Sequence, residues 1–173
     1  MRSIKSYFLL IFLTAIIFIF GLVLNNSAYA QESGNSSINI QVNHVAGFFE
    51  KIAEKLQLFL KFNNQDKVSY HQNLTEKRLA ELKFVINSES YTDKDYLLED
   101  TTSRYTSYLG VLTDFIINNH LNEKRKDMTA LFDRHRKILE GLRDHFPVES
   151  GWWLLLDQDV AATKIYSDKL NNT

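Results

Sequence analysis

Apolar residues recur at spacings of three and four from Phe48 to about Leu170, and this helical period constrains the fold more than any other feature. Polar breaks at Asn63-Asn64, 87–93 and Asn118–Asn122, together with Pro147, divide the period into five segments. The third segment opens with Thr92 followed by Asp95, which resembles a capping box. Apolar stripes joined by short polar loops predict an all-α, antiparallel bundle of about five helices.

Residues 1–30 have the three parts of a secretory signal peptide. Arg2 and Lys5 precede the uncharged run Tyr7–Leu24, and the segment ends in Ala-Tyr-Ala at Ala30. The run is also just long enough to remain as an uncleaved membrane anchor. Either form places the remainder outside the cytoplasm, so we expect an extracytoplasmic domain that is secreted, periplasmic or membrane-anchored. We expect membrane contact only through this segment, where it is retained.

Residues 31–47 have the composition of a flexible polar linker that precedes a bundle domain at 48–171. Within the linker, apolar and polar residues alternate over 37–43, which is the period of a β-strand. No second strand is apparent for it to pair with. We therefore expect extended linker there, with pairing to a partner's strand as the alternative.

The charge balance argues against nucleic acid as a partner. Removal of residues 1–30 leaves 18 basic and 21 acidic residues, a net charge of −3, and no basic tract dominates. The chain contains no cysteine, so the exported domain must be stable without disulfides.

The second expected helix carries many charged residues. A solvated face with helix-stabilising pairs is the simplest interpretation of Lys67, Glu76, Lys77, Glu81 and Lys83. The opposite side, at spacings of three and four, holds Val68, His71, Thr75, Arg78, Leu79, Leu82 and Ile86.

Five polar or aromatic residues fall at positions that face the expected core. His71 and Arg78 come from the second helix, Tyr105 and Tyr108 from the third, and His135 from the fourth. Buried polar groups without partners cost about 1–3 kcal/mol each. We predict that these five side chains satisfy one another in a polar layer that fixes helix register. A small-ligand or anion pocket built from the same residues is the alternative.

Catalytic and metal-binding patterns are missing from the sequence. The five histidines include no pair at helical ligand spacing, and Asp157-Gln158-Asp159 lacks the glycine and glutamate of a calcium loop. There is no Gly-x-Ser-x-Gly motif, and the six glycines are scattered. We therefore expect no enzyme activity, no cofactor and no metal.

The last expected helix begins with five large apolar residues, Trp152–Leu156. Most of them should enter the core. The alternative is that Trp152 or Trp153 lies at the surface as an anchor for a partner or for the membrane interface.

Two segments, EKLQLFLKF (Glu54–Phe62) and KVSYHQNLTEKRLAEL (Lys67–Leu82), resemble the bacterial family known as domain of unknown function 5667. HRKILEGLRDHFP (His135–Pro147) is similar to its later His-x-x-x-Leu-x-x-Leu segment, and the resemblance covers about Phe48–Leu170. The family's Pro-Gly…Leu-Tyr entrance is absent, and Ala53 stands where an aromatic residue is common. The resemblance implies an exported or membrane-tethered helical bacterial domain and implies no activity.

From these features we expect an interaction or structural module at the bacterial cell envelope, with an unknown protein as its partner. A periplasmic-type helical chaperone or stress sensor that binds apolar clients is one alternative. A small-ligand-binding bundle is the other.

Overall fold

The computed structural model describes residues 40–88 and 94–172. The chain divides into two units, Met1–Ser37 and Ile38–Thr173, and only the second contains described residues. The predicted signal peptide and the Thr92 capping box therefore lie outside the described residues. So does the beginning of the alternating segment at 37–43, whose described part, residues 40–43, forms no strand.

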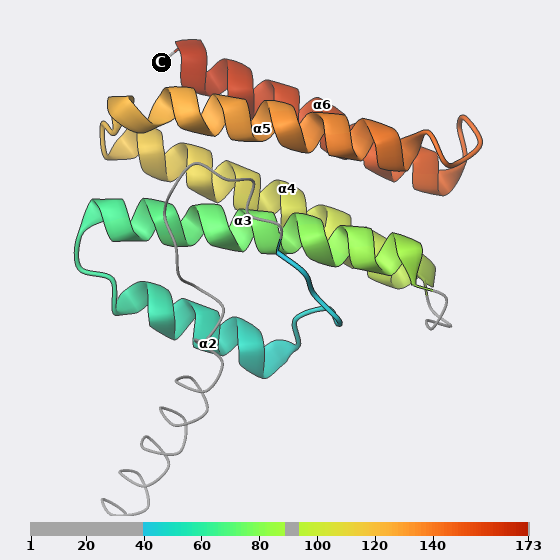
Figure 1. Cartoon of the computed structure of the whole chain (residues 1–173), viewed down its shortest axis with the longest axis horizontal. Helices are drawn as coiled ribbons and strands as arrows, with labels where there is room; N and C mark the ends of the chain where they lie inside the picture. Colours follow the sequence, from blue (N-terminus) through green and yellow to red (C-terminus); the bar gives the residue numbers. More distant parts are fainter. Residues whose placement is uncertain (1–39, 89–93, 173) are drawn as a thin grey trace, which may run out of the picture. The chain divides into compact units, whose positions relative to one another are not determined.

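The described residues fold into five helices, which confirms the all-α bundle (Figure 1). The helices are α2 Phe48–Phe59, α3 Asn64–Asn87, α4 Lys94–Asn118, α5 Asn122–Arg143 and α6 Gly151–Asn172. Two helix starts lie directly after breaks in the helical period of the sequence. The Asn63 side chain accepts a hydrogen bond from the Asp66 N–H at 2.7 Å and caps α3. The Ser150 hydroxyl accepts one from the Trp153 N–H at 3.2 Å and caps α6.

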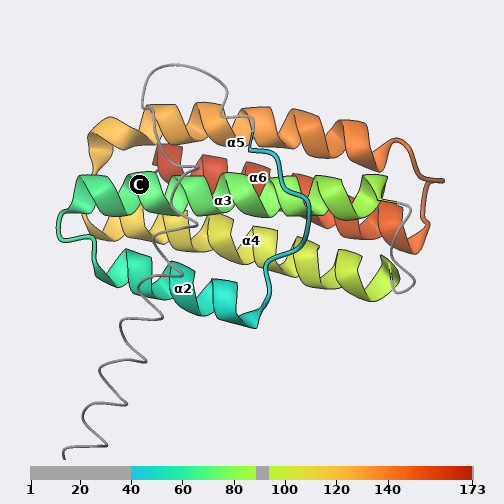
Figure 2. The same ribbon diagram turned by 60° about the horizontal axis from the view of Figure 1, so that its bottom comes forward.

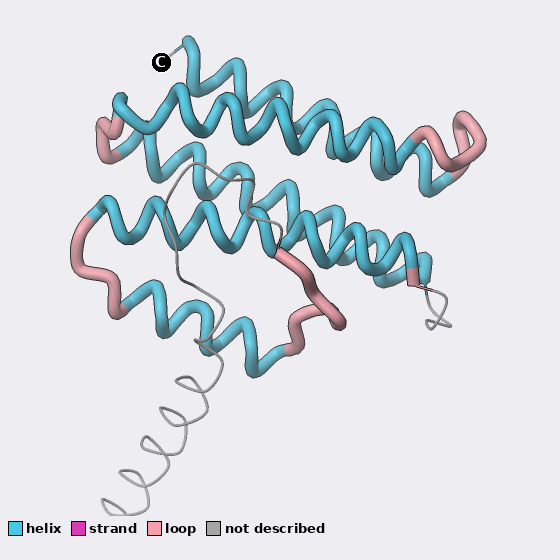
Figure 3. The backbone as a smooth tube through the Cα atoms, viewed as in Figure 1, coloured by secondary structure: helices cyan, strands magenta, loops and turns pink. Residues whose placement is uncertain are grey.

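Helices α3 to α6 form the body of the bundle. Figures 2 and 3 show these four long helices running roughly side by side, joined by short loops. They enclose one apolar core, whose fully buried members include Leu82, Leu98, Leu109, Phe132 and Leu156. Apolar contacts among neighbouring helices therefore supply most of the stability of this unit.

Helix α3 is covered along almost its whole length. Every residue from Tyr70 to Ile86 is buried or half-buried. α2 lies along one side of α3, and the other bundle helices cover the rest (Figures 1 and 2). A helix with neighbours on several sides must bury polar positions as well as apolar ones, and α3 does so.

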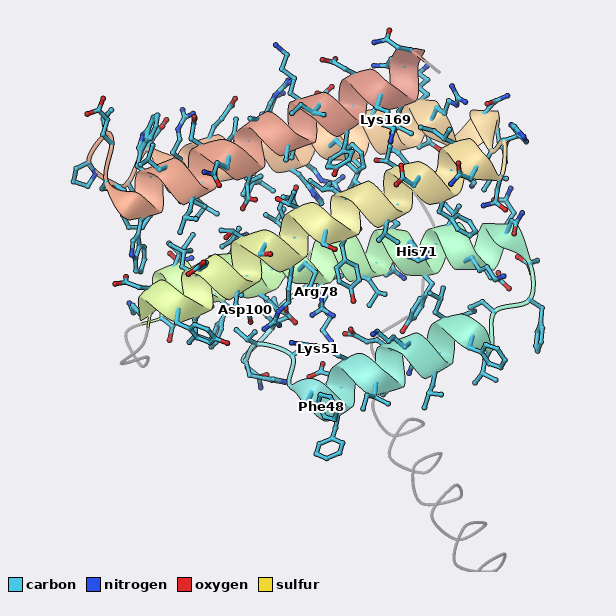
Figure 4. The ribbon with its side chains drawn as sticks, turned by 180° about the vertical axis from the view of Figure 1, so that it is seen from behind. Phe48, Lys51, His71, Arg78, Asp100 and Lys169 are labelled. Atoms are coloured by element: carbon cyan, nitrogen blue, oxygen red, sulfur yellow. The ribbon has the colours of Figure 1, made fainter. Side chains whose placement is uncertain are left out.

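Helix α2 exposes its apolar side and turns its charged side toward the bundle, which is the reverse of the other helices. Its apolar stripe is exposed, with relative exposures of 83% at Phe49 and 82% at Phe59, and no α2 side chain belongs to the apolar core of the described residues. Figure 4 shows Phe48 pointing away from the bundle. The side of α2 that faces the bundle carries Glu50 and Glu54 instead.

Within residues 40–88 and 94–172, none of the helices combines the length and the apolar character needed to cross a bilayer.

Candidate functional site

The sequence predicts that Glu76 and Glu81 of α3 lie on a solvated face, and this prediction is wrong. Glu76 is 7% exposed and Glu81 is fully buried. Each of them is the anionic partner of a basic side chain inside the bundle, as described below. The interpretation failed because α3 is covered on several sides, so its charged positions do not all reach water.

Arg78 lies at the centre of the first cluster, which we call the arginine cluster and which comprises Arg78, Glu54, Glu81, Lys77 and Tyr108. The Arg78 guanidinium donates to Glu81 Oε1 at 2.6 Å and forms an ion pair with Glu54 of α2. Its Cζ lies 4.8 Å from the centre of the Tyr108 ring, which is a cation–π contact. Lys77 Nζ completes the cluster with a 2.8 Å bond to the other Glu54 oxygen.

The charges in the arginine cluster compensate one another. Burial lowers the pKa of Arg78, but the carboxylates of Glu81 and Glu54 outweigh it, so the pKa is raised overall. Burial likewise lowers the pKa of Lys77, and bonds to Glu50 and Glu54 raise it above its usual value. The cluster therefore keeps its basic groups charged although they are shielded from water.

The same cluster attaches the segment before α2. The Ala46 N–H donates to Glu81 Oε1 at 3.1 Å, and Arg104 of α4 donates to the Ala46 carbonyl at 3.3 Å. Tyr70 of α3 adds a contact further along α2, since its hydroxyl lies 2.8 Å from Gln57 Oε1. α2 is thus held to the bundle by polar and ionic contacts on one side (Figure 4).

His135 organises a second cluster, the histidine cluster, with Tyr105, Glu76 and Arg134. The Tyr105 hydroxyl lies 3.0 Å from His135 Nδ1, and His135 Nε2 lies 3.2 Å from Glu76 Oε2. Arg134 pairs with the other Glu76 oxygen. Both hydrogen bonds of His135 form when the Tyr105 hydroxyl donates to Nδ1 and Nε2–H donates to Glu76.

The histidine cluster has the order of groups seen in proton relays, but its hydroxyl and imidazole are both fully buried. Burial strongly raises the pKa of Tyr105, and the nearby acids Asp159 and Glu76 raise it further. A phenol in this environment remains protonated and acts as a hydrogen-bond donor. The arrangement therefore joins α3, α4 and α5 and offers no reactive group to a solute.

Asp159 of α6 is a separate buried acid. Thr106 of α4 donates to its Oδ1 at 2.6 Å. Burial raises the pKa of Asp159 to about 7, although the bond from Thr106 opposes the shift. This acid is therefore close to half-protonated at neutral pH.

The five residues predicted to form one polar layer occupy three places. Arg78 stacks on Tyr108, and Tyr105 contacts His135, so four of the five residues meet as two separate pairs. His71 is apart from both, with its ring centre 5.1 Å from that of Phe115, and burial followed by the nearby Lys67 lowers the pKa of His71.

The two tryptophans are half-buried, which lies between the two interpretations given for them. Trp152 donates to Asp95 Oδ1 at 2.6 Å and packs on Phe146 with ring centres 5.0 Å apart. Trp153 lies beneath the Arg143 guanidinium at 5.3 Å. Both indoles thus have partners within the domain.

Neither cluster contributes to the one surface depression described for residues 40–88 and 94–172. A shallow surface depression of about 380 Å³ lies between α5 and α6, and its lining includes Arg136, Glu140, Asp157 and Lys164. None of the five predicted layer residues lines it. The described residues also contain no group of three or more side chains placed to bind a metal ion.

Reasoning from the sequence missed the acidic partners Glu54, Glu76 and Glu81. One local signal was available, because Arg78 and Glu81 are three residues apart and so neighbours on one helix. The other two pairs join residues 24 and 59 positions apart along the chain. No periodicity within a single helix predicts such contacts.

The fold and its clusters define a small helical bundle that carries internal ionic networks and holds a peripheral helix by its charged side. The family model described as domain of unknown function (DUF5667) matches residues 48–141, and the chain belongs to this family. The match runs from the start of α2 into α5 and confirms the family resemblance read from the sequence. Comparison with curated proteins and with solved structures gives no match.

Proposed function

We propose that this domain is an interaction module at the bacterial cell envelope and that it docks through the exposed face of α2. The observation that carries the proposal is the orientation of α2, whose charged side is used internally and whose apolar side is open. We call this surface the α2 apolar face. Its members are Phe48, Phe49, Ile52, Leu56, Phe59, Leu60 and Phe62, with exposures from 39% to 90%.

Exposure of this kind has a thermodynamic cost in water. Each large apolar side chain left exposed forgoes about 1.5–3 kcal/mol of transfer free energy. Contiguous apolar surface on a folded domain is typical of a docking site. The arginine cluster prevents α2 from relieving the exposure by rotating about its axis, because rotation would separate Glu54 from Arg78.

The placement at the envelope follows from the signal-like residues 1–30. The apolar run ends at Leu24, and α2 is the first helix after it in the described chain. Export or membrane attachment through residues 1–30 would bring the domain to the envelope.

Site-specific photo-crosslinking in living cells tests the proposal. A photoreactive residue replaces Phe49 or Phe59 in the full chain, and the matched control replaces Ile165, a 63% exposed apolar residue of α6. Adducts with one or a few defined envelope components at Phe49 and Phe59, and none at Ile165, are expected. A broad series of unrelated exported chains would indicate a chaperone instead. Equal labelling at all three positions would refute the docking surface.

A further inference from the structure

We infer that the α2 apolar face lies in the lipid surface of the membrane, so that α2 is an interfacial helix. The inference rests on the proposed function and names the partner of the same surface. It goes beyond the sequence, which predicts membrane contact only through a retained segment within residues 1–30. Three observations favour lipid over a protein partner.

The first observation is the composition of the face. Four of its seven members are phenylalanines, and three of these, Phe49, Phe59 and Phe62, are more than 80% exposed. Helices that lie in a membrane interface combine such aromatic and aliphatic side chains on one side with lysines on the other, and they enter the headgroup boundary by about 5–10 Å. The α2 apolar face supplies the aromatic and aliphatic side of such a helix.

The second observation is charge. Both acids of α2 are paired, the buried Glu54 with Arg78 and the half-buried Glu50 with Lys77. Lys55 is exposed and adjoins the face, since it lies three residues after Ile52. Lys55 is therefore the exposed charged side chain of α2, and its positive charge complements anionic lipid headgroups. A second copy docked on the same face would instead present lysine to lysine, because an isologous contact repeats the same charges.

The third observation is size and position. α2 has 12 residues and is about 18 Å long. One face of such a helix is smaller than the roughly 800 Å² that each partner buries in a stable protein interface. A lipid surface requires no matched protein area of this size from an amphipathic helix. Leu24 and Phe48 are separated by 23 residues, which reach at most about 80 Å when extended.

Depth measurement on the full chain tests the inference. The chain has no cysteine, so single cysteines for spin labels can replace Phe49, Phe59 or Ile165 without background. The labelled chains are reconstituted in vesicles of phosphatidylethanolamine and phosphatidylglycerol. Collision with oxygen, which concentrates in lipid, is compared with collision with a water-soluble nickel chelate.

We expect the labels at Phe49 and Phe59 to be protected from nickel and the label at Ile165 to remain accessible to it. Leu56→Asp should return the two α2 labels to water, because an aspartate lowers partition into lipid roughly 100-fold. Ile165→Asp is the matched control and should leave them protected. Circular dichroism of each variant confirms that the helices remain folded.

Two results would overturn the inference. One is nickel accessibility at Phe49 and Phe59 equal to that at Ile165. The other is spin–spin broadening between α2 labels that disappears on dilution with unlabelled chain, which would identify a second copy as the occupant. If the α2 labels stay in water while crosslinks from the same positions capture a defined protein in cells, the docking module stands and the lipid partner is wrong. If both experiments are negative, the proposed function fails as well.

Discussion

Removal of the Arg78 guanidinium is the sharpest perturbation of this structure. Arg78 is 1% exposed and is the only cation within 3 Å of Glu81 among the described ion pairs. Arg78→Leu would leave Glu81 with Arg104 at 4.0 Å and Glu54 with Lys77 at 2.8 Å. Loss of one partner from a buried ion pair costs about 3–5 kcal/mol, because the remaining charge is buried without compensation.

The contact with Tyr108 adds to this loss. A desolvated cation–π contact contributes up to about 2 kcal/mol, but it is not independent of the ion pairs. We therefore expect Arg78→Leu to lower the free energy of unfolding by about 4 kcal/mol. That is a large share of the roughly 5–15 kcal/mol typical of a whole domain.

Urea unfolding followed by tryptophan fluorescence and circular dichroism measures the change by linear extrapolation. The matched control is Lys169→Met, which disrupts a pair with Asp114 whose side chains are about half-exposed. Such surface pairs contribute at most about 1 kcal/mol. Hydrogen exchange should show that α2 amides lose protection first in Arg78→Leu. A loss below 1 kcal/mol, or unchanged protection in α2, would refute the role assigned to the arginine cluster.

Three further predictions concern single positions. His135→Leu should cost about 2–4 kcal/mol by thermal unfolding, because it removes the partner of the buried Tyr105 hydroxyl and of one Glu76 oxygen. His71→Leu should cost less than about 1 kcal/mol, and equal losses would contradict the separation of the two histidines. The pKa of Asp159 is about 7 in the folded domain and 3.8 for a free side chain, so the free energy of unfolding should fall as the pH rises from 4 to 7 and then level off. Asp159→Asn should remove this pH dependence and raise the free energy of unfolding at pH 8 by up to roughly 4 kcal/mol. An unchanged pH dependence in urea titrations of the variant would count against the prediction. Phe49→Ser and Phe59→Ser should each change the unfolding free energy by less than about 0.5 kcal/mol, and a loss above 2 kcal/mol would mean that the α2 apolar face is covered.

The sequence predicts the helices and their boundaries, because both depend on residues that are close together in the chain. Asn63 and Ser150 cap helices where polar breaks predict them, and the turn at 119–121 follows a cluster of asparagines. His120 adopts a left-handed conformation in that turn, with φ of 54°. Each of these features depends on neighbours a few residues away, so a single chain read in order predicts them.

The ionic clusters were predicted only in part because their partners are distant. Periodicity placed Arg78 and His135 toward the bundle, but it assigned Glu76 and Glu81 to water. A helical wheel divides a helix into one inner and one outer side. α3 is covered by α2 on one side and by the core on the other, so it has no continuous outer side and does not follow this division.

The orientation of α2 is the clearest example of this limit, and its explanation lies in α3. The apolar stripe of α2 alone predicts burial. The surface of α3 beneath it, however, presents Tyr70, Lys77, Arg78 and Glu81, which would lose their partners against phenylalanine and leucine. Glu54 is compatible with that surface, and the apolar side of α2 is not. The polar surface of α3 therefore determines which side of α2 is buried. The acidic side of α2 pairs with the basic side chains of α3, and the apolar side of α2 remains exposed.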